Sequence, residues 1–149
     1  MDHLLKLTSK LLLLHKDSKS YVRDFDTILE EIAYLHDIRC IALLVDHFDD
    51  HSEFSELMFG IIHLLESFDD ESYIKELIKV SPKLFEKAPG WASTLFIRIM
   101  NHPPSLFILR EVLNNINEAN PERQAVANIL GYVKVNEPAL IEKVNIVLN

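Results

Sequence analysis

Apolar residues recur three and four positions apart along most of the chain, and this spacing restricts the possible folds more than any other feature. It places apolar side chains on one face of an α-helix. Such stripes occur within 28–35, 54–65, 95–100, 106–116, 126–133 and 140–147. No segment combines strict alternation with the Gly- or Asn-rich turn of a β-hairpin. We therefore expect an all-α protein of roughly eight to ten helical segments.

Three glycines and six prolines interrupt this pattern. Proline lacks a backbone donor and has a fixed φ, so it marks helix starts and breaks. We expect helix boundaries at or near Pro82, Pro89, Pro103, Pro104, Pro121 and Pro138.

A ten-residue pattern occurs twice at a spacing of twenty: FDDHSEFSEL (48–57) and FDDESYIKEL (68–77). We expect each copy to end one helix and start the next, with Asp50 and Asp70 as caps and the preceding aspartates as adjacent alternatives. Asp50 and Glu53 also fit a capping box. One helix and one turn in about twenty residues predict stacked antiparallel helix hairpins. The expected architecture is a short, curved, HEAT-like array forming a single domain, residues 1–149.

The composition is that of a globular protein, with 48% hydrophobic and 26% charged residues. The single cysteine, Cys40, excludes an internal disulfide, and its apolar surroundings predict a buried thiol. No apolar run reaches the ~20 residues that span a bilayer. The first eighteen residues fit an amphipathic helix and not a signal peptide. We expect a cytoplasmic protein with no membrane partner.

The net charge of −8 is distributed unevenly. Residues 24–76 contain fifteen acidic and two basic side chains and carry −13, whereas the remainder carries +5. Binding to nucleic acid requires clustered Lys and Arg, so we expect no nucleic-acid partner. A field of one sign accelerates association with an oppositely charged molecule. The acidic segment therefore favours a basic protein partner.

His47 and His51 lie four residues apart, which is the spacing of a zinc site on a continuous helix. The FDD sequence between them is expected to break the helix, and neither an H-E-x-x-H motif nor paired C-x-x-C motifs follow. The chain also lacks a G-x-S-x-G elbow and a Gly-rich phosphate loop. We expect no catalytic residue, metal or cofactor. An enzyme using carboxylates or a metal at 46–53 is the least favoured class.

The acidic residues are more numerous than helix caps require, and few basic residues lie near them in the sequence. The candidate partner-binding residues are Asp46, Asp49, Asp50, Glu53, Glu56, Asp69, Asp70, Glu71 and Tyr73. Tyr73 stands among polar residues and is the favoured aromatic anchor. For Trp91, which follows a Pro-Gly break, packing in the core is favoured and an interface role is the alternative.

Several short features lie close together between residues 58 and 101: HLLESF at 63–68, the Asp69-Asp70 turn, Tyr73, Ala88-Pro89 with Trp91, and RIMN at 98–101. With these features the chain resembles the all-helical immunity proteins of bacterial polymorphic toxin systems, the group called immunity protein family thirty. The helical pattern extends this resemblance over roughly residues 25–115. Members often have a larger aromatic residue where this chain has Phe59.

The resemblance implies a small cytoplasmic protein that binds the C-terminal domain of a cognate secreted toxin and neutralises it. Many such toxins are nucleases with basic clefts, which suits the acidic segment. Inhibition would then be by occlusion through an acidic face, with no chemical step and no cofactor. The alternative is a helical-repeat adaptor that binds a basic protein or peptide.

Overall fold

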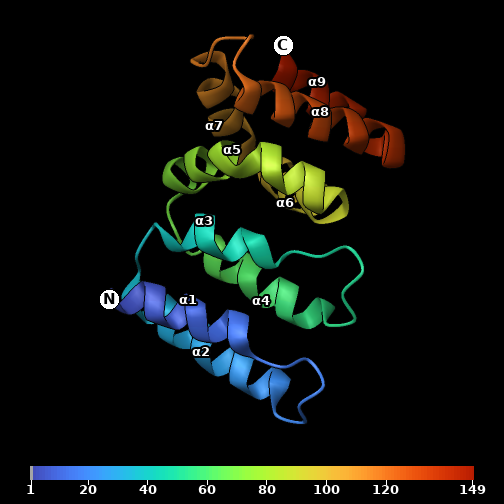
Figure 1. Ribbon diagram of the computed structural model, residues 1–149. Coiled ribbons are helices and arrows are strands. Elements are labelled where there is room, and N and C mark those ends of the chain that lie inside the picture. The colour runs from blue at the N-terminus through green and yellow to red at the C-terminus, as the bar shows by residue number, and fades with distance from the viewer. Residues whose placement is uncertain (1) are drawn as a thin grey trace.

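The computed structural model describes residues 2–149, which contain nine α-helices, two short 3-10 helices and no β-strand (Figure 1). The elements are α1 (His3–Leu13), α2 (Tyr21–Leu35), α3 (Cys40–Leu44), η1 (Val45–His47), α4 (Ser55–Leu65), α5 (Asp70–Lys87), α6 (Pro89–Met100), α7 (Pro103–Asn114), α8 (Pro121–Asn136), η2 (Pro138–Leu140) and α9 (Ile141–Leu148). The all-α expectation is confirmed.

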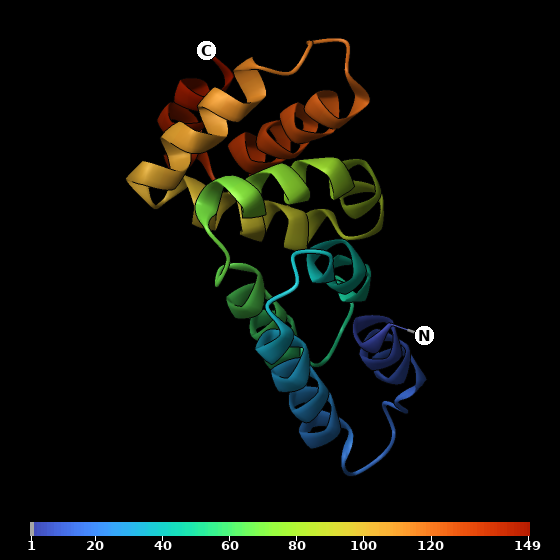
Figure 2. The same ribbon diagram turned by 90° about the vertical axis from the view of Figure 1, so that its left-hand side faces the viewer.

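The helices are stacked in layers along one axis, with the two termini at opposite ends (Figures 1 and 2). Helices α1 and α2 form the first layer, α3 and α4 the second, and α5 and α6 the third, while α7, α8 and α9 pack together at the far end. Contacts of α2 with α4, of α3 with α5 and of α5 with both α7 and α8 join the layers. This arrangement is consistent with a short HEAT-like array.

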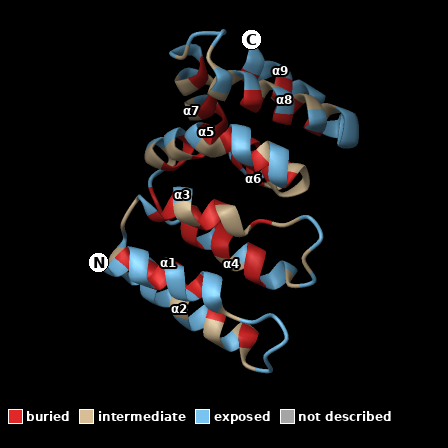
Figure 3. Ribbon diagram, in the orientation of Figure 1, coloured by how far each residue is buried: buried red, intermediate tan, exposed pale blue. Residues whose placement is uncertain are grey.

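The layers enclose one continuous hydrophobic cluster that runs from Leu4 in α1 to Val147 in α9. Buried positions face the neighbouring layers and exposed positions face outward (Figure 3). Each fully buried Leu or Ile side chain contributes about 1.5–3 kcal/mol relative to exposure, so these stripes hold the stack together. Cys40 is buried, as expected, and burial raises the pKa of its thiol to about 12. None of the helices in residues 2–149 is both long and apolar enough to cross a membrane.

Prolines mark most of the later helix starts. The first residues of α6, α7 and α8 are Pro89, Pro103 and Pro121. At the first position of a helix a backbone N–H has no acceptor within the helix, so proline costs no hydrogen bond there. Pro82 is different, because α5 continues through it. The expected break is wrong there because Ile78 and Leu84, on either side, are both buried and hold the two halves of α5 against the core.

Candidate partner-binding surface

The eight acidic candidates divide into two groups at opposite ends of α4. The first group lies between α3 and the first turn of α4: Asp46, Asp49, Asp50, Glu53 and Glu56. The second group precedes and opens α5: Asp69, Asp70 and Glu71. Helix α4 has 11 residues and is therefore about 16 Å long. Figure 1 shows the two connections on opposite sides of the molecule, so these residues do not form the single acidic face expected from the sequence.

Asp50 caps a helix, but not the helix that follows it in the chain. Its carboxylate accepts hydrogen bonds from the backbone N–H groups of Gly90 (2.8 Å) and Trp91 (3.0 Å) in the first turn of α6. Helix α6 has no side-chain cap of its own, and its positive end attracts a carboxylate. Helix α4 begins only at Ser55 and has no side-chain cap. The expected local cap, and the capping box with Glu53, are therefore wrong.

Trp91 connects the same loop to the core. Its indole Nε1 donates to the Asp49 carbonyl oxygen at 3.0 Å. Its ring centroid lies 5.8 Å from that of Phe48 and 5.3 Å from that of Phe59. Trp91 is partly buried by these contacts. They give the ring the packing role that the sequence favoured.

Tertiary contacts pair several carboxylates that have few basic neighbours in the sequence. Asp46 lies 2.9 Å from the Lys83 ammonium in α5. Arg98 in α6 donates two hydrogen bonds to Glu66, each 2.8 Å long. Two further pairs lie within α5: Glu71 with Lys75 at 2.9 Å, and Glu76 with Lys79 at 3.0 Å. Because Lys83 and Arg98 come from outside residues 24–76, the surface of this segment is less acidic than its sequence.

The second group contains one local cap and one long-range contact. Asp69 accepts a hydrogen bond from the Ser72 N–H at 3.0 Å, and this bond lowers the pKa of Asp69. The cap of α5 is therefore Asp69 and not the favoured Asp70. Asp70 accepts a hydrogen bond from the Ser105 hydroxyl in α7 at 2.8 Å, and Ser105 Oγ lies 2.6 Å from His102 Nδ1. The single hydroxyl hydrogen of Ser105 is donated to Asp70. Ser105 must therefore accept from His102, and Nδ1 of His102 is the donor.

Tyr73 is a core residue. Its side chain is 2% exposed, and its hydroxyl has no hydrogen-bond partner within residues 2–149. Burial raises the pKa of Tyr73 above its usual value. The expectation of an exposed aromatic anchor is wrong because Tyr73 shares the buried face of α5 with Ile74 and Leu77. Its polar sequence neighbours lie on other faces of the same helix.

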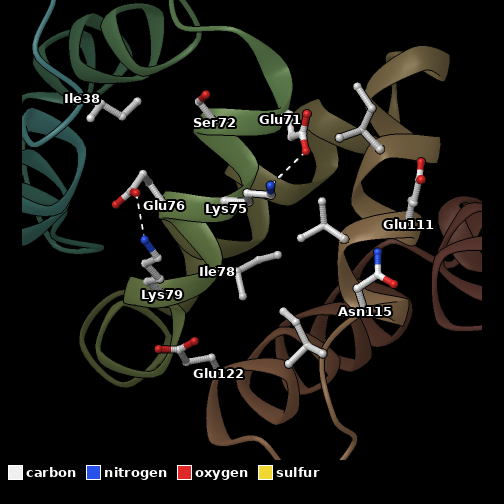
Figure 4. A pocket seen from close by; sticks show the side chains of 13 residues that line it. Ile38, Glu71, Ser72, Lys75, Glu76, Ile78, Lys79, Glu111, Asn115 and Glu122 are labelled. Carbon is white, nitrogen blue, oxygen red and sulfur yellow. Dashed lines mark hydrogen bonds and ion pairs between the residues drawn. The ribbon is translucent and has the colours of Figure 1, made fainter.

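A groove between α5, α7 and α8 combines apolar and charged side chains (Figure 4). Its volume is about 640 Å³. Its apolar lining consists of Ile38, Ile78, Ile108, Val112 and Ile116. Its charged lining consists of Glu71, Lys75, Glu76, Lys79, Glu111 and Glu122. With five apolar and six charged side chains, this lining is more polar than that of the mainly apolar pockets that hold small molecules.

The charged side chains give this groove a net charge of −2, from four glutamates and two lysines. Both lysines are paired within α5, as the dashed lines in Figure 4 show. Among residues 2–149, no basic side chain forms an ion pair with Glu111 or Glu122. The carboxylates on the α7 and α8 sides of the groove are therefore available to a basic partner.

Sequence reasoning missed Glu111 and Glu122. Both lie outside the acidic segment 24–76, so the local charge gave no signal there. Helical spacing places Glu111 beside Ile108 on one face of α7, and Asn115 follows the end of this helix. No local pattern could indicate that this face lies opposite α5.

Within residues 2–149, no three His, Cys, Asp or Glu side chains lie close enough together to hold a metal ion. His47 is partly buried, with its ring edge-on to Phe25 at a centroid distance of 6.0 Å. Burial lowers the pKa of His47, which favours the neutral imidazole. His51 is exposed, and its backbone N–H donates to the Asp49 carboxylate at 2.9 Å.

A second, smaller pocket lies where α5, α6 and α7 meet. Its volume is about 400 Å³. It is lined by six of the residues on which the sequence resemblance rests: Glu66, Asp70, Tyr73, Arg98, Ile99 and Asn101. His102 and Ser105, at the start of α7, are also part of its lining.

Comparison with known proteins gives a family match. Residues 10–109 match the family model described as Immunity protein 30. The matched region contains the whole of α2 to α6 and most of α7, whereas α8 and α9 lie beyond it. No curated protein and no solved structure matches the chain.

Proposed function

The chain belongs to the Immunity protein 30 family, and from this premise we propose that it binds and neutralises a cognate bacterial toxin domain through the groove between α5, α7 and α8. The observation that carries this proposal is the composition of the groove. Partly buried apolar side chains lie beside two carboxylates, Glu111 and Glu122, that have no cationic partner within residues 2–149. Glu71, one of the residues singled out in the sequence, lies on the same groove.

The two kinds of side chain have different roles in such a complex. Burial of the apolar lining supplies binding free energy at about 25 cal/mol per Å² removed from water. The carboxylates attract a basic surface, raise the association rate and reject acidic partners. A partner that matches the groove therefore carries apolar side chains flanked by Lys or Arg.

A nuclease domain is one toxin class that has such a surface, because its substrate cleft must attract phosphate. Neutralisation would occur by occlusion: the bound immunity protein covers the surface that the substrate needs. This mechanism requires slow dissociation and involves no chemical step or cofactor.

The protein has a second acidic surface, which the test must separate from the groove. Glu53 and Glu56, in the first acidic group, are exposed and form no ion pair within residues 2–149. They belong to the surface that the sequence favoured. We compare two charge reversals of equal size: Glu111→Lys with Glu122→Lys in the groove, and Glu53→Lys with Glu56→Lys on the α3–α4 connection. Each pair includes one glutamate in the first turn of a helix, Glu122 in α8 and Glu56 in α4, so the effect on helix stability is matched.

The measurement is a calorimetric titration of each variant with the C-terminal toxin domain encoded next to this chain, at low and high salt. We expect the wild-type protein to bind one-to-one with nanomolar affinity that weakens with salt. We expect the groove variant to bind about 100-fold more weakly and the control variant to bind within about threefold of wild type.

Other outcomes would change the assignment. A larger loss in the Glu53 and Glu56 variant would move the site to the α3–α4 connection. Micromolar, rapidly reversible binding would favour a helical-repeat adaptor, because incomplete neutralisation of a toxin is lethal. The absence of binding by the wild-type protein would overturn the proposed function for this toxin.

A further inference from the structure

The hydroxyl of Tyr73 stands out among the buried polar groups. Within residues 2–149, it is the buried side-chain oxygen or nitrogen that lacks a hydrogen-bond partner. A phenylalanine would fill the same space without an unpaired polar atom, so packing does not account for the hydroxyl. Tyr73 lines the pocket of about 400 Å³ where α5, α6 and α7 meet. The hydroxyl oxygen itself is closed to solvent, so a group in this pocket reaches it only when the side chains around it shift.

The charges in this pocket are unequally paired. Glu66 and Arg98 neutralise each other through two hydrogen bonds of 2.8 Å. Asp70 has no such partner: among residues 2–149 it accepts one hydrogen bond, from the neutral Ser105 hydroxyl. The nearest basic nitrogen to it is Nδ1 of His102, at 4.0 Å, and this nitrogen already donates to Ser105. Asp70 is therefore the carboxylate in the pocket without its own cation.

One further cation contacts a residue of the pocket lining. Lys143 of α9 donates to Oδ1 of Asn101 at 2.8 Å, so its hydrogen bond is made to a neutral amide and not to Asp70. Asp70 and Tyr73 are three residues apart in α5 and therefore lie on the same face of the helix. Together they offer a carboxylate oxygen and a hydroxyl oxygen as acceptors.

We propose that this pocket receives a lysine side chain from the partner, whose ammonium group donates to Asp70 and to the Tyr73 hydroxyl. A primary ammonium has three donors and no acceptor, which suits two acceptors on separate side chains. A guanidinium prefers two oxygens in one plane, as the Glu66 carboxylate already offers to Arg98. The identity of the partner rests on the proposed function, but the preference of the pocket for an ammonium group can be tested without it.

The first test uses n-butylammonium chloride as a mimic of the lysine side chain and follows backbone amide shifts by NMR. We expect saturable shifts centred on residues 70–73 and 102–105. Asp70→Asn should weaken this binding about tenfold, because it removes the charge and keeps the shape of the side chain. Glu111→Gln, in the other groove, should leave it unchanged. Shifts that are equal in Asp70→Asn, or that are produced by sodium acetate instead, would overturn the proposal.

The second test is Tyr73→Phe, which removes only the hydroxyl. We expect its unfolding midpoint in urea to equal or exceed that of the wild-type protein, because no buried group loses a partner. Its affinity for n-butylammonium and for the toxin domain should fall about tenfold. If Tyr73→Phe folds normally and binds both ligands as tightly as wild type, the hydroxyl is not a ligand and the proposal is wrong.

Failure of this inference and failure of the proposed function give different results. If the wild-type protein binds the toxin domain and both Asp70→Asn and Tyr73→Phe bind it equally tightly, the lysine pocket is overturned and the toxin-binding function stands. If the toxin domain does not bind but n-butylammonium binds in an Asp70-dependent way, the toxin-binding function is overturned and the ammonium pocket stands.

Discussion

The two Phe-Asp-Asp turns, 48–50 and 68–70, have the same three residues in different places: the first lies between α3 and α4 of the second layer, and the second joins the second layer to the third. In each turn the first aspartate acts locally. Asp49 accepts a hydrogen bond from the His51 N–H, and Asp69 accepts one from the Ser72 N–H. In each turn the second aspartate reaches a helix start far along the chain. Asp50 contacts the first turn of α6, and Asp70 contacts the first turn of α7.

The two turns lead into different local structures. The second opens α5 immediately at Asp70, whereas the first continues into a loop and α4 begins only at Ser55. In the first turn the Asp50 carboxylate is bonded to α6, and Trp91 holds the Asp49 carbonyl oxygen. The same short sequence therefore either starts a helix directly or leads into a loop that is hydrogen-bonded to the next layer. The two turns differ in the partner that the neighbouring helix supplies: two backbone N–H groups of α6 for Asp50, and the Ser105 hydroxyl of α7 for Asp70.

The largest expected effect comes from Asp50→Ala. This change leaves the N–H groups of Gly90 and Trp91 at the start of α6 without an acceptor. Loss of a helix cap costs about 1–2 kcal/mol, so we expect the free energy of unfolding to fall by this amount. Urea denaturation of the folded protein measures it. The control is Glu53→Ala, an exposed residue in the same loop, which should change stability by less than about 0.5 kcal/mol. Equal effects of the two variants would show that the Asp50 carboxylate does not stabilise the start of α6.

A smaller effect is expected from Gly90→Ala, which acts on the same contact from the other side. A Cβ at this position would lie 3.0 Å from Oδ1 of Asp50, so the carboxylate would have to move by a few tenths of an ångström and its hydrogen bonds to the helix start would weaken. The intrinsic preference of alanine for helices offsets part of the loss. We expect a net destabilisation of about 0.5 kcal/mol, measured by the same denaturation.

Two variants sharpen this prediction. Gly131→Ala, in α8, meets no atom within 4 Å and should stabilise the protein by about 0.5–1 kcal/mol. In the Asp50→Ala background the clash is absent, so Gly90→Ala should also become stabilising. If Gly90→Ala has the same effect with and without Asp50, the two residues are not coupled.

The smallest effect is expected from Asp69→Asn, because asparagine also caps helices well. The variant isolates the charge of the local cap. The Ser72 hydrogen bonds lower the pKa of Asp69 below its ordinary value of 3.8 in the folded protein. The charge therefore stabilises the fold above pH 3.8, and this contribution is lost as the pH falls through the folded pKa. We expect wild type to be slightly more stable than Asp69→Asn near neutral pH and the difference to vanish in acid. A difference that grows on acidification would contradict the cap.

Much of the fold was predictable because the signals are local. Helical spacing of apolar residues indicated the helices, and proline marked the starts of α6, α7 and α8. The same approach failed at Pro82 and Tyr73. At Pro82 the packing of both halves of α5 outweighs the lost backbone hydrogen bond. At Tyr73 the polar neighbours in the sequence lie on other faces of the helix, so they carry no information about its burial.

The candidate site was less predictable because its residues meet across layers. The sequence showed an acidic middle segment, but Lys83 and Arg98 from later helices pair with Asp46 and Glu66 there. Glu111 and Glu122, which leave the groove acidic, lie outside that segment. A charge count along the chain measures neither effect.

The sequence by itself determined the helical class of this protein, the buried faces of most helices and the start of α5 at the second Phe-Asp-Asp turn. These features depend on residues no more than about four positions apart, which one helical turn brings together. Only the tertiary structure decided that Asp50 caps α6, that Asp70 meets Ser105, and that Glu111 faces α5 across a groove. Such partners come together only when the layers stack, because the burial of apolar faces sets the layer geometry before any single polar contact can form.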